Sequence, residues 1–176
     1  MIEIICKICY KCKYILDYQD NLYAAELCEL YSIPFTIYVV SGRINSFQYL
    51  TEENLKQLTK NKFCTIGAHT KNHFCLEDLT KEEIHEELYS SKERLEEIID
   101  TKVEHVSFPH GSYNDLALTK VKELKYKTSS TSHIGLNQLK RVDHFQLKRT
   151  EIIASDTIKD LDNKIKGYFD YLSFKP

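Results

Sequence analysis

The 176-residue sequence predicts a single α/β domain whose sheet is mainly parallel. Runs of β-branched and aromatic residues alternate along the chain with segments of helical periodicity. The length is enough for one sizeable core, and no repeat or Pro/Gly-rich linker divides residues 1–176. Apolar residues make up 42% and charged residues 28%, which is typical of a globular protein and excludes a low-complexity chain.

The first half of the chain supplies the elements in alternation. Residues 2–16 alternate between apolar and polar, which predicts a half-buried strand with a break in it, because the run exceeds the usual strand length. Residues 22–31 predict a helix that ends before Pro34, because proline disfavours the helical conformation in the preceding residue. The next predicted elements are a strand over 35–40, a helix over 52–60 with Thr51 as N-cap, and a strand over 63–68.

The clearest helix covers residues 81–99. Thr80 and Glu83 form a capping box at its start. Its predicted buried stripe consists of Ile84, Leu88, Leu95, Ile98 and Ile99. The elements that follow are a strand over 103–108, a helix over 114–124, strand-like segments over 126–131 and 145–153, and a helix over 156–172. In parallel α/β folds the chemistry lies on loops at the carboxyl ends of the strands.

The composition excludes several classes of protein. Lys and Arg total 24 against 26 Asp and Glu, and this net charge of −2 is less basic than a general nucleic-acid-binding protein requires. No apolar run approaches the roughly 20 residues of a membrane helix, and Lys7, Lys11 and Lys13 interrupt the stretch that a signal peptide needs. We therefore expect a cytoplasmic protein with six reduced cysteines, those of residues 6–12 being strand residues rather than metal ligands.

Charge is unevenly distributed along the chain. From Glu77 to Asp100 there are ten acids and three bases, and from Lys120 to Thr150 there are eight bases and two acids. The first segment predicts an acidic helix face and the second a basic surface strip. An alternative interpretation is that the basic strip helps to hold an anionic substrate, such as a phosphate-linked sugar.

Two histidines directly follow the strand that ends at Ala68. His69 and His73 are four residues apart, so both imidazoles can face the same way across a helical turn or a tight loop. This spacing allows both rings to bind one metal ion. The alternative is that they are ordinary surface or capping histidines.

A second polar segment, Phe108–Asp115, follows the predicted strand over 103–108. Pro109 and Gly111 fix a tight turn there and allow a backbone N–H to approach a ligand closely. The alternative is an ordinary strand-to-helix turn with Asn114 as the N-cap of the following helix.

These two segments, in this order, resemble the second and third motifs of the polysaccharide deacetylases, carbohydrate esterase family 4. The resemblance extends from about Asp17 to Ile153. Within this range, the segments that also carry the resemblance are Ser32–Val40, Ile66–Leu76, Glu82–Val106 and Phe145–Ile152.

The resemblance implies a deformed (β/α) barrel, complete or incomplete, and a hydrolase of C–N amide bonds. Such enzymes remove the acetyl group from an N-acetylated sugar or polysaccharide. They use a divalent metal, often zinc, that activates a water molecule, while a carboxylate accepts the proton of that water. The alternative is a catalytically inactive deacetylase-like protein that binds carbohydrate or metal.

The family motifs assign roles to seven residues of this chain. The metal ligands are expected to be Asp17, His69 and His73. Asp17 and His110 are the expected catalytic residues, and Pro109, Gly111 and Tyr113 are expected to bind substrate. A backbone N–H of the third-motif turn is expected to stabilise the oxyanion.

The first family motif is incomplete in this sequence. Its second half is present as Tyr18–Asn21, but the two expected aspartates fall on Ile15 and Leu16, which can neither ligate a metal nor accept a proton. A one-residue deletion would place Asp17 at the metal position and leave Leu16 at the base position. Either Asp17 or Asp20 substitutes for the lost carboxylate, or the chain is inactive.

The third motif departs from the family in one residue. His110 stands where the family commonly has tyrosine or phenylalanine. The late family motif that carries a histidine acid has no clear match, and His133 and His144 both remain open as candidates for that acid.

Overall fold

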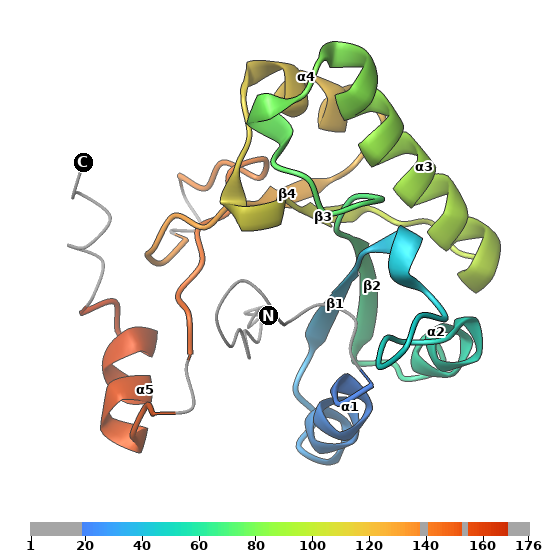
Figure 1. Cartoon of the computed structure of the whole chain (residues 1–176). Helices are drawn as coiled ribbons and strands as arrows, with labels where there is room; N and C mark the ends of the chain where they lie inside the picture. Colours follow the sequence, from blue (N-terminus) through green and yellow to red (C-terminus); the bar gives the residue numbers. More distant parts are fainter. Residues whose placement is uncertain (1–18, 138–140, 153–154, 169–176) are drawn as a thin grey trace.

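The computed structural model describes residues 19–137, 141–152 and 155–168 (Figure 1). The predicted strand over residues 2–16 lies outside the described residues. The elements are α1 (Asn21–Leu30), β1 (Phe35–Val39), η1 (Ser41–Arg43), α2 (Glu52–Leu58), β2 (Cys64–Ala68), η2 (Leu76–Asp78), α3 (Lys81–Ile99), β3 (His105–Ser107), η3 (Pro109–Gly111), α4 (Asp115–Glu123), β4 (Thr128–Ser130) and α5 (Ile158–Ile165).

The four strands form one parallel sheet in the order β1-β2-β3-β4. Each strand is followed by helical structure, so the predicted α/β class and the parallel pairing are confirmed. Figure 1 shows α3 and α4 lying along one side of this sheet. Within the described residues the sheet is an open arc of a (β/α) barrel, because no strand closes it from β4 back to β1.

One face of the sheet is apolar and carries the core. Alternate residues of the strands point toward the helices, and they pack with the buried stripe of α3. The stripe residues Ile84, Leu88 and Leu95 are fully buried, as the helical periodicity predicts. The strand residues of this core are Phe35, Ile37, Val39, Ile66, Ala68 and Val106.

The opposite face of the sheet is polar. Tyr38 is paired with Gly67, and its ring occupies the space that a side chain at Gly67 would need, 2.6 Å from the position of a Cβ. The Tyr38 hydroxyl lies 3.3 Å from Oγ of Ser130, which is itself paired with the buried Ser107. This hydroxyl-lined face is the inner face of the arc, and His69 continues it because it lies two residues after Gly67.

The predicted helix starts are confirmed by side-chain caps. Thr51 and Thr80 each complete a capping box, with Asn54 and Glu83 as the reciprocal partners. Asn114 accepts a hydrogen bond from the Ala117 amide and begins α4 as its N-cap. These caps place the turns before α2, α3 and α4 where the sequence predicts them.

The strand predicted over residues 145–153 is confirmed only around Leu147. Of its described residues, only Leu147 pairs with the sheet, through a parallel bridge to Ser130. The Leu147 amide donates to the Ser129 carbonyl at 2.9 Å and its carbonyl accepts from the Thr131 amide at 3.0 Å, but the Arg149 amide donates to the His133 carbonyl instead of continuing the ladder. On the opposite edge, the Asn137 side chain accepts from the Lys148 amide and donates to the Lys148 carbonyl, both at 2.9 Å. An amide side chain therefore takes the place of a neighbouring strand at Lys148.

The last helix is shorter than predicted. α5 ends at Ile165 rather than at residue 172, because Gly167 has a φ of 78° and the amide of Tyr168 returns to the carbonyl of Asn163 at 3.0 Å. This is the usual way in which a glycine in the left-handed region ends a helix. No helix in the described part of the chain is long and apolar enough to cross a membrane.

Candidate functional site

His69 leaves the carboxyl end of β2 in a fixed orientation. Its backbone amide donates to the Val39 carbonyl at 2.8 Å, and its side chain is 2% exposed. Nδ1 lies 2.5 Å from the Ser107 carbonyl oxygen. Because a carbonyl only accepts hydrogen bonds, Nδ1 carries the proton and the lone pair of Nε2 is left for a ligand.

The loop that carries both histidines is held by a buried carboxylate of α3. Glu87 is 4% exposed, and its Oε2 accepts from the amides of Lys71 at 3.0 Å and Asn72 at 2.8 Å. Its Oε1 accepts from the Asn72 side chain at 2.6 Å. The buried Glu87 carboxylate therefore accepts three hydrogen bonds from the loop between the two histidines and fixes its conformation.

His73 is brought next to His69 by two residues in the left-handed region. Thr70 has a φ of 64° and His73 a φ of 66°. The Thr70 hydroxyl accepts from the His73 amide at 3.1 Å. The ring centroids of His69 and His73 are 4.8 Å apart at an interplanar angle of 62°. Of the two geometries that their spacing allowed, a helical turn and a tight loop, the structure has the tight loop.

The third-motif turn adds a third imidazole. His110 has a φ of 56° within η3, and its exposed ring lies 4.7 Å from the ring of His73, centroid to centroid. Its carbonyl accepts from the Ser132 hydroxyl at 3.2 Å, in the loop after β4. The structure thus brings His69, His73 and His110 together at the carboxyl edge of the sheet.

Both histidines of the second motif are kept neutral by their surroundings. Burial, together with the neighbouring His73 and the Arg149 guanidinium, lowers the pKa of His69 well below its ordinary value of 6.5. Burial, followed by His110 and Arg43, lowers the pKa of His73 to about 4. Neutral imidazoles with free lone pairs are the form that binds a metal ion.

Acid is expected to destabilise the metal-free protein between about pH 6.5 and pH 4. In this window the unfolded chain takes up protons on its histidines while His69 and His73 resist protonation in the folded state, so the free energy of unfolding falls as the pH falls. His73→Gln removes one of these groups and should give a shallower decline in urea denaturation between pH 7 and pH 5.

The matched control is His85→Gln, at an exposed histidine on α3 that stacks on Tyr89. It should keep the wild-type dependence on pH. Equal slopes for wild type and His73→Gln would contradict the assignment of His73 as a neutral group in the folded state.

The residues present fit a metal site in part. His69 and His73 have the ligand type, the protonation state and the proximity that a divalent metal requires. In the described part of the chain, no group of three His, Cys, Asp or Glu side chains is arranged to hold a metal. Asp20 begins α1 as its N-cap and completes no such group, and Asp17 lies outside the described residues.

The predicted substrate-binding residues form the wall beside His110. Pro109 and Gly111 are buried, and Tyr113 stacks on Phe108 with a centroid distance of 5.2 Å. The Tyr113 hydroxyl donates to the Gln146 side chain at 2.9 Å. The amides of Gly111 and Ser112 donate to carbonyls within the turn, so an oxyanion contact from either would replace an existing hydrogen bond.

The two open candidates for a histidine acid differ in position. The ring of His133 lies 6.0 Å from the ring of Tyr113, so it borders the third-motif turn. His144 is tied to β4 through its backbone carbonyl, which accepts from the Ser129 amide at 2.9 Å. The structure therefore places His133 beside the site. His144 makes no such ring contact with Tyr113 among the described residues.

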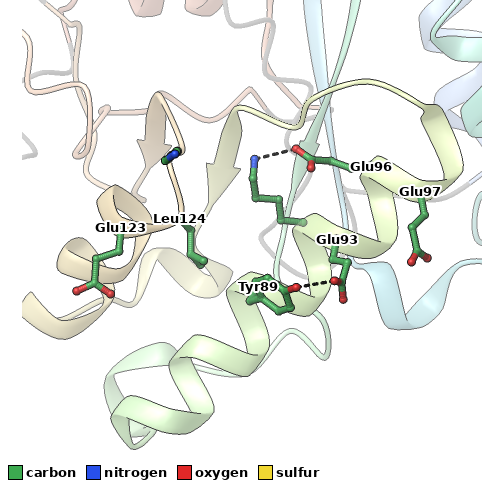
Figure 2. Close-up of a pocket in the computed structure, with 8 residues that line it drawn as sticks. Tyr89, Glu93, Glu96, Glu97, Glu123 and Leu124 are labelled. Carbon is green, nitrogen blue, oxygen red and sulfur yellow. Dashed lines mark hydrogen bonds and ion pairs between the residues drawn. The ribbon is translucent and has the colours of Figure 1, made fainter.

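A hollow of about 530 Å³ lies between α3 and the end of α4 and is shown in Figure 2. Its acids are already partnered: Glu96 pairs with Lys92 at 3.0 Å, Glu93 accepts from the Tyr89 hydroxyl, and Glu123 pairs with Lys120. We therefore assign this hollow to surface ion pairs rather than to chemistry. The lining residues are Tyr89, Lys92, Glu93, Glu96, Glu97, Glu123, Leu124 and Lys125.

The fold and the site together define an α/β barrel-type protein with an imidazole cluster at the carboxyl edge of its sheet. The family model described as polysaccharide deacetylase matches residues 22–129, which is more than half of the chain. The chain belongs to this family, and the resemblance stated from its motifs is confirmed.

Relatives within the family share the fold at low identity. YxkH of Bacillus subtilis (strain 168), which carries the name of a polysaccharide deacetylase, is 27% identical over 119 residues, covering 68% of this chain and 41% of YxkH. The structure of the Streptococcus pyogenes deacetylase PplD in complex with acetate matches with a TM-score of 0.79 at 23% identity, covering 85% of this chain and 66% of PplD.

A third comparison extends the same picture. BC0361, a polysaccharide deacetylase from Bacillus cereus, matches with a TM-score of 0.76 at 21% identity over 85% of this chain and 49% of BC0361. The chain therefore spans between about two fifths and two thirds of the length of these proteins. The open arc of strands agrees with this, because it is part of the (β/α) barrel of the family.

Proposed function

We propose that this chain is a metal-dependent deacetylase that hydrolyses the amide bond of an N-acetylated sugar or polysaccharide. The observation that carries the proposal is the pair of neutral imidazoles of His69 and His73, with the His69 Nε2 lone pair free, in a chain of this family. His69 and His73 would hold the metal, with Asp17 as the third ligand. Zinc suits such a set of nitrogen and oxygen donors.

The chain's own residues supply binding and proton transfer. A bound divalent metal polarises a carbonyl and lowers the pKa of water. Asp17, outside the described residues, is proposed to accept a proton, and the exposed imidazole of His110 to donate one to the leaving amine. The wall of Pro109, Gly111 and Tyr113 would position the sugar ring beside His110.

Zinc retention tests this function first. The wild-type protein and a His69→Ala/His73→Ala double variant are dialysed against zinc and their bound zinc is measured. The double variant should bind one equivalent less, because it lacks both imidazoles. The thiols can bind zinc elsewhere, so only the difference between the two proteins counts. Circular dichroism checks the folding of the double variant, and the single variant His73→Gln gives a milder substitution.

The second measurement is amine release from an N-acetylated sugar oligomer. Wild type should release amine, and His69→Ala should not. A full rate in His69→Ala would contradict the proposed metal site. Zinc binding without amine release would instead favour an inactive deacetylase-like protein, which the replacement of the first-motif aspartates by Ile15 and Leu16 already suggests. Aspartate at both positions should then create activity.

A further inference from the structure

Two arginines lie beside the histidine pair without a carboxylate partner. Arg43 acts electrostatically on His73 and Arg149 acts on His69. Neither forms an ion pair within the described residues, whereas Arg94 on α3 pairs with both Glu52 and Glu97. In the part of the chain that the structure describes, these two guanidiniums place positive charge at the rim of the site, while Glu87, the carboxylate that also acts on His73, is buried and bonded to the loop amides.

Arg43 is fixed relative to the histidine loop by its own backbone. It ends η1, whose first two amides donate into that loop: Ser41 to the Thr70 carbonyl at 3.2 Å and Gly42 to the Lys71 carbonyl at 2.9 Å. A Cβ at Gly42 would lie 2.6 Å from the Lys71 oxygen, so only glycine permits this approach. The segment carrying Arg43 is docked on the segment carrying His73.

The guanidinium of Arg43 is also held in place. It donates to the Tyr49 hydroxyl and lies 5.3 Å from the centroid of the Tyr49 ring. The loop between them is closed by the Asn45 amide, which donates to the Leu50 carbonyl at 3.1 Å. Arg43 is exposed, so its remaining N–H donors are presented to solvent from an ordered position. Such preorganisation reduces the entropy lost when a ligand binds.

We propose that Arg43 binds an oxyanion on the substrate, so that the substrate is an acidic N-acetylated sugar carrying a phosphate or a carboxylate. The planar fork of a guanidinium matches both groups and binds them in pairs of parallel hydrogen bonds. The proposal rests on the proposed function in one respect, namely that the acetamide of the same sugar lies at His69 and His73. Arg43 then determines which sugars are accepted, through their charge.

The test compares the binding of four probes to the full chain by calorimetry: N-acetylglucosamine, N-acetylglucosamine 1-phosphate, N-acetylmuramic acid and inorganic phosphate. The two anionic sugars should bind about tenfold or more tightly than the neutral sugar, and the phosphate and carboxylate arms show which oxyanion is preferred. Arg43→Gln should remove this preference and Arg43→Lys should keep part of it. Arg94→Gln, at an arginine that is already paired, should leave the preference unchanged.

Three outcomes would overturn the inference. The first is equal binding of the neutral and anionic sugars to wild type, and the second is an undiminished preference in Arg43→Gln. The third is inorganic phosphate binding as tightly as the sugar phosphate, which would make Arg43 an anion site unconnected with a sugar. Amine release is measured separately on the neutral oligomer. If the chain releases amine but shows no preference for anionic sugars, only the inference about Arg43 is refuted. If it prefers anionic sugars but releases no amine, only the proposed deacetylase function is refuted.

Discussion

Glu87→Ala is expected to lower the free energy of unfolding by about 2–4 kcal/mol and to weaken zinc retention at the same time. The substitution leaves the amides of Lys71 and Asn72 without their shared acceptor in a buried position. It also removes the acceptor of the Asn72 side chain. The loop between His69 and His73 would then relax, so stability and site geometry should fail together.

Urea denaturation and zinc retention measure the two effects on the same samples. Glu86→Ala is the matched control, because Glu86 is the neighbouring carboxylate on α3 and makes an exposed ion pair with Lys71 at 2.8 Å. It should cost less than about 1 kcal/mol and leave zinc binding intact. Glu87→Gln keeps the shape but offers one acceptor and one donor, so it should fall between the two. Equal losses for Glu86→Ala and Glu87→Ala would refute the role of Glu87.

The sequence already contained a signal for Glu87. On α3 the stripe of Ile84, Leu88 and Leu95 is apolar and buried, and Glu87 lies within that stripe instead of on the charged face. A carboxylate in a buried stripe needs donors from elsewhere in the chain. Periodicity shows that such donors must exist, but it does not show that they are the amides of the histidine loop, fifteen and sixteen residues earlier.

Predictions based on local patterns succeeded, and those that depend on distant partners did not. The caps at Thr80 and Asn114 and the strand ending at Ala68 follow from nearby residues, and the structure has all three. The strand predicted over 145–153 is reduced to one bridge at Leu147, because the Arg149 amide leaves the ladder and donates to the His133 carbonyl in the loop after β4. A pattern of apolar residues cannot reveal that competition, since it comes from another loop.

The candidate site shows the same difference between predictions from local patterns and predictions that depend on distant residues. The spacing of His69 and His73 and their position after a strand predicted the pair, and the turn at Pro109 predicted where His110 lies. The position of Arg43 beside the site was missed, and Arg149 was included only as one of eight bases in the predicted basic strip, because each reaches the site from a different loop. Both are single basic residues in ordinary surroundings, so sequence alone gives no reason to select them from the other cations.

Gly111→Ala is expected to destabilise the protein by about 2–4 kcal/mol and to displace His110. Gly111 has a φ of 73°, which costs a residue with a side chain about 1 kcal/mol. Its Cβ would lie 2.0 Å from Oγ of Ser132 and 2.4 Å from the Ser132 backbone nitrogen. Relief of those contacts requires the third-motif turn to move away from the loop after β4, and His110 moves with that turn.

A double variant separates the two parts of this effect. Gly111→Ala with Ser132→Gly removes the hydroxyl and Cβ that the new methyl would meet, but it keeps the backbone nitrogen at 2.4 Å. Urea denaturation should therefore show partial recovery, with Ser132→Gly alone as the reference. Full recovery would mean that the backbone contact and the positive φ matter little. No loss in Gly111→Ala itself would contradict the close approach of the two loops. Because that approach also holds His110 4.7 Å from His73, amine release should follow stability through the series.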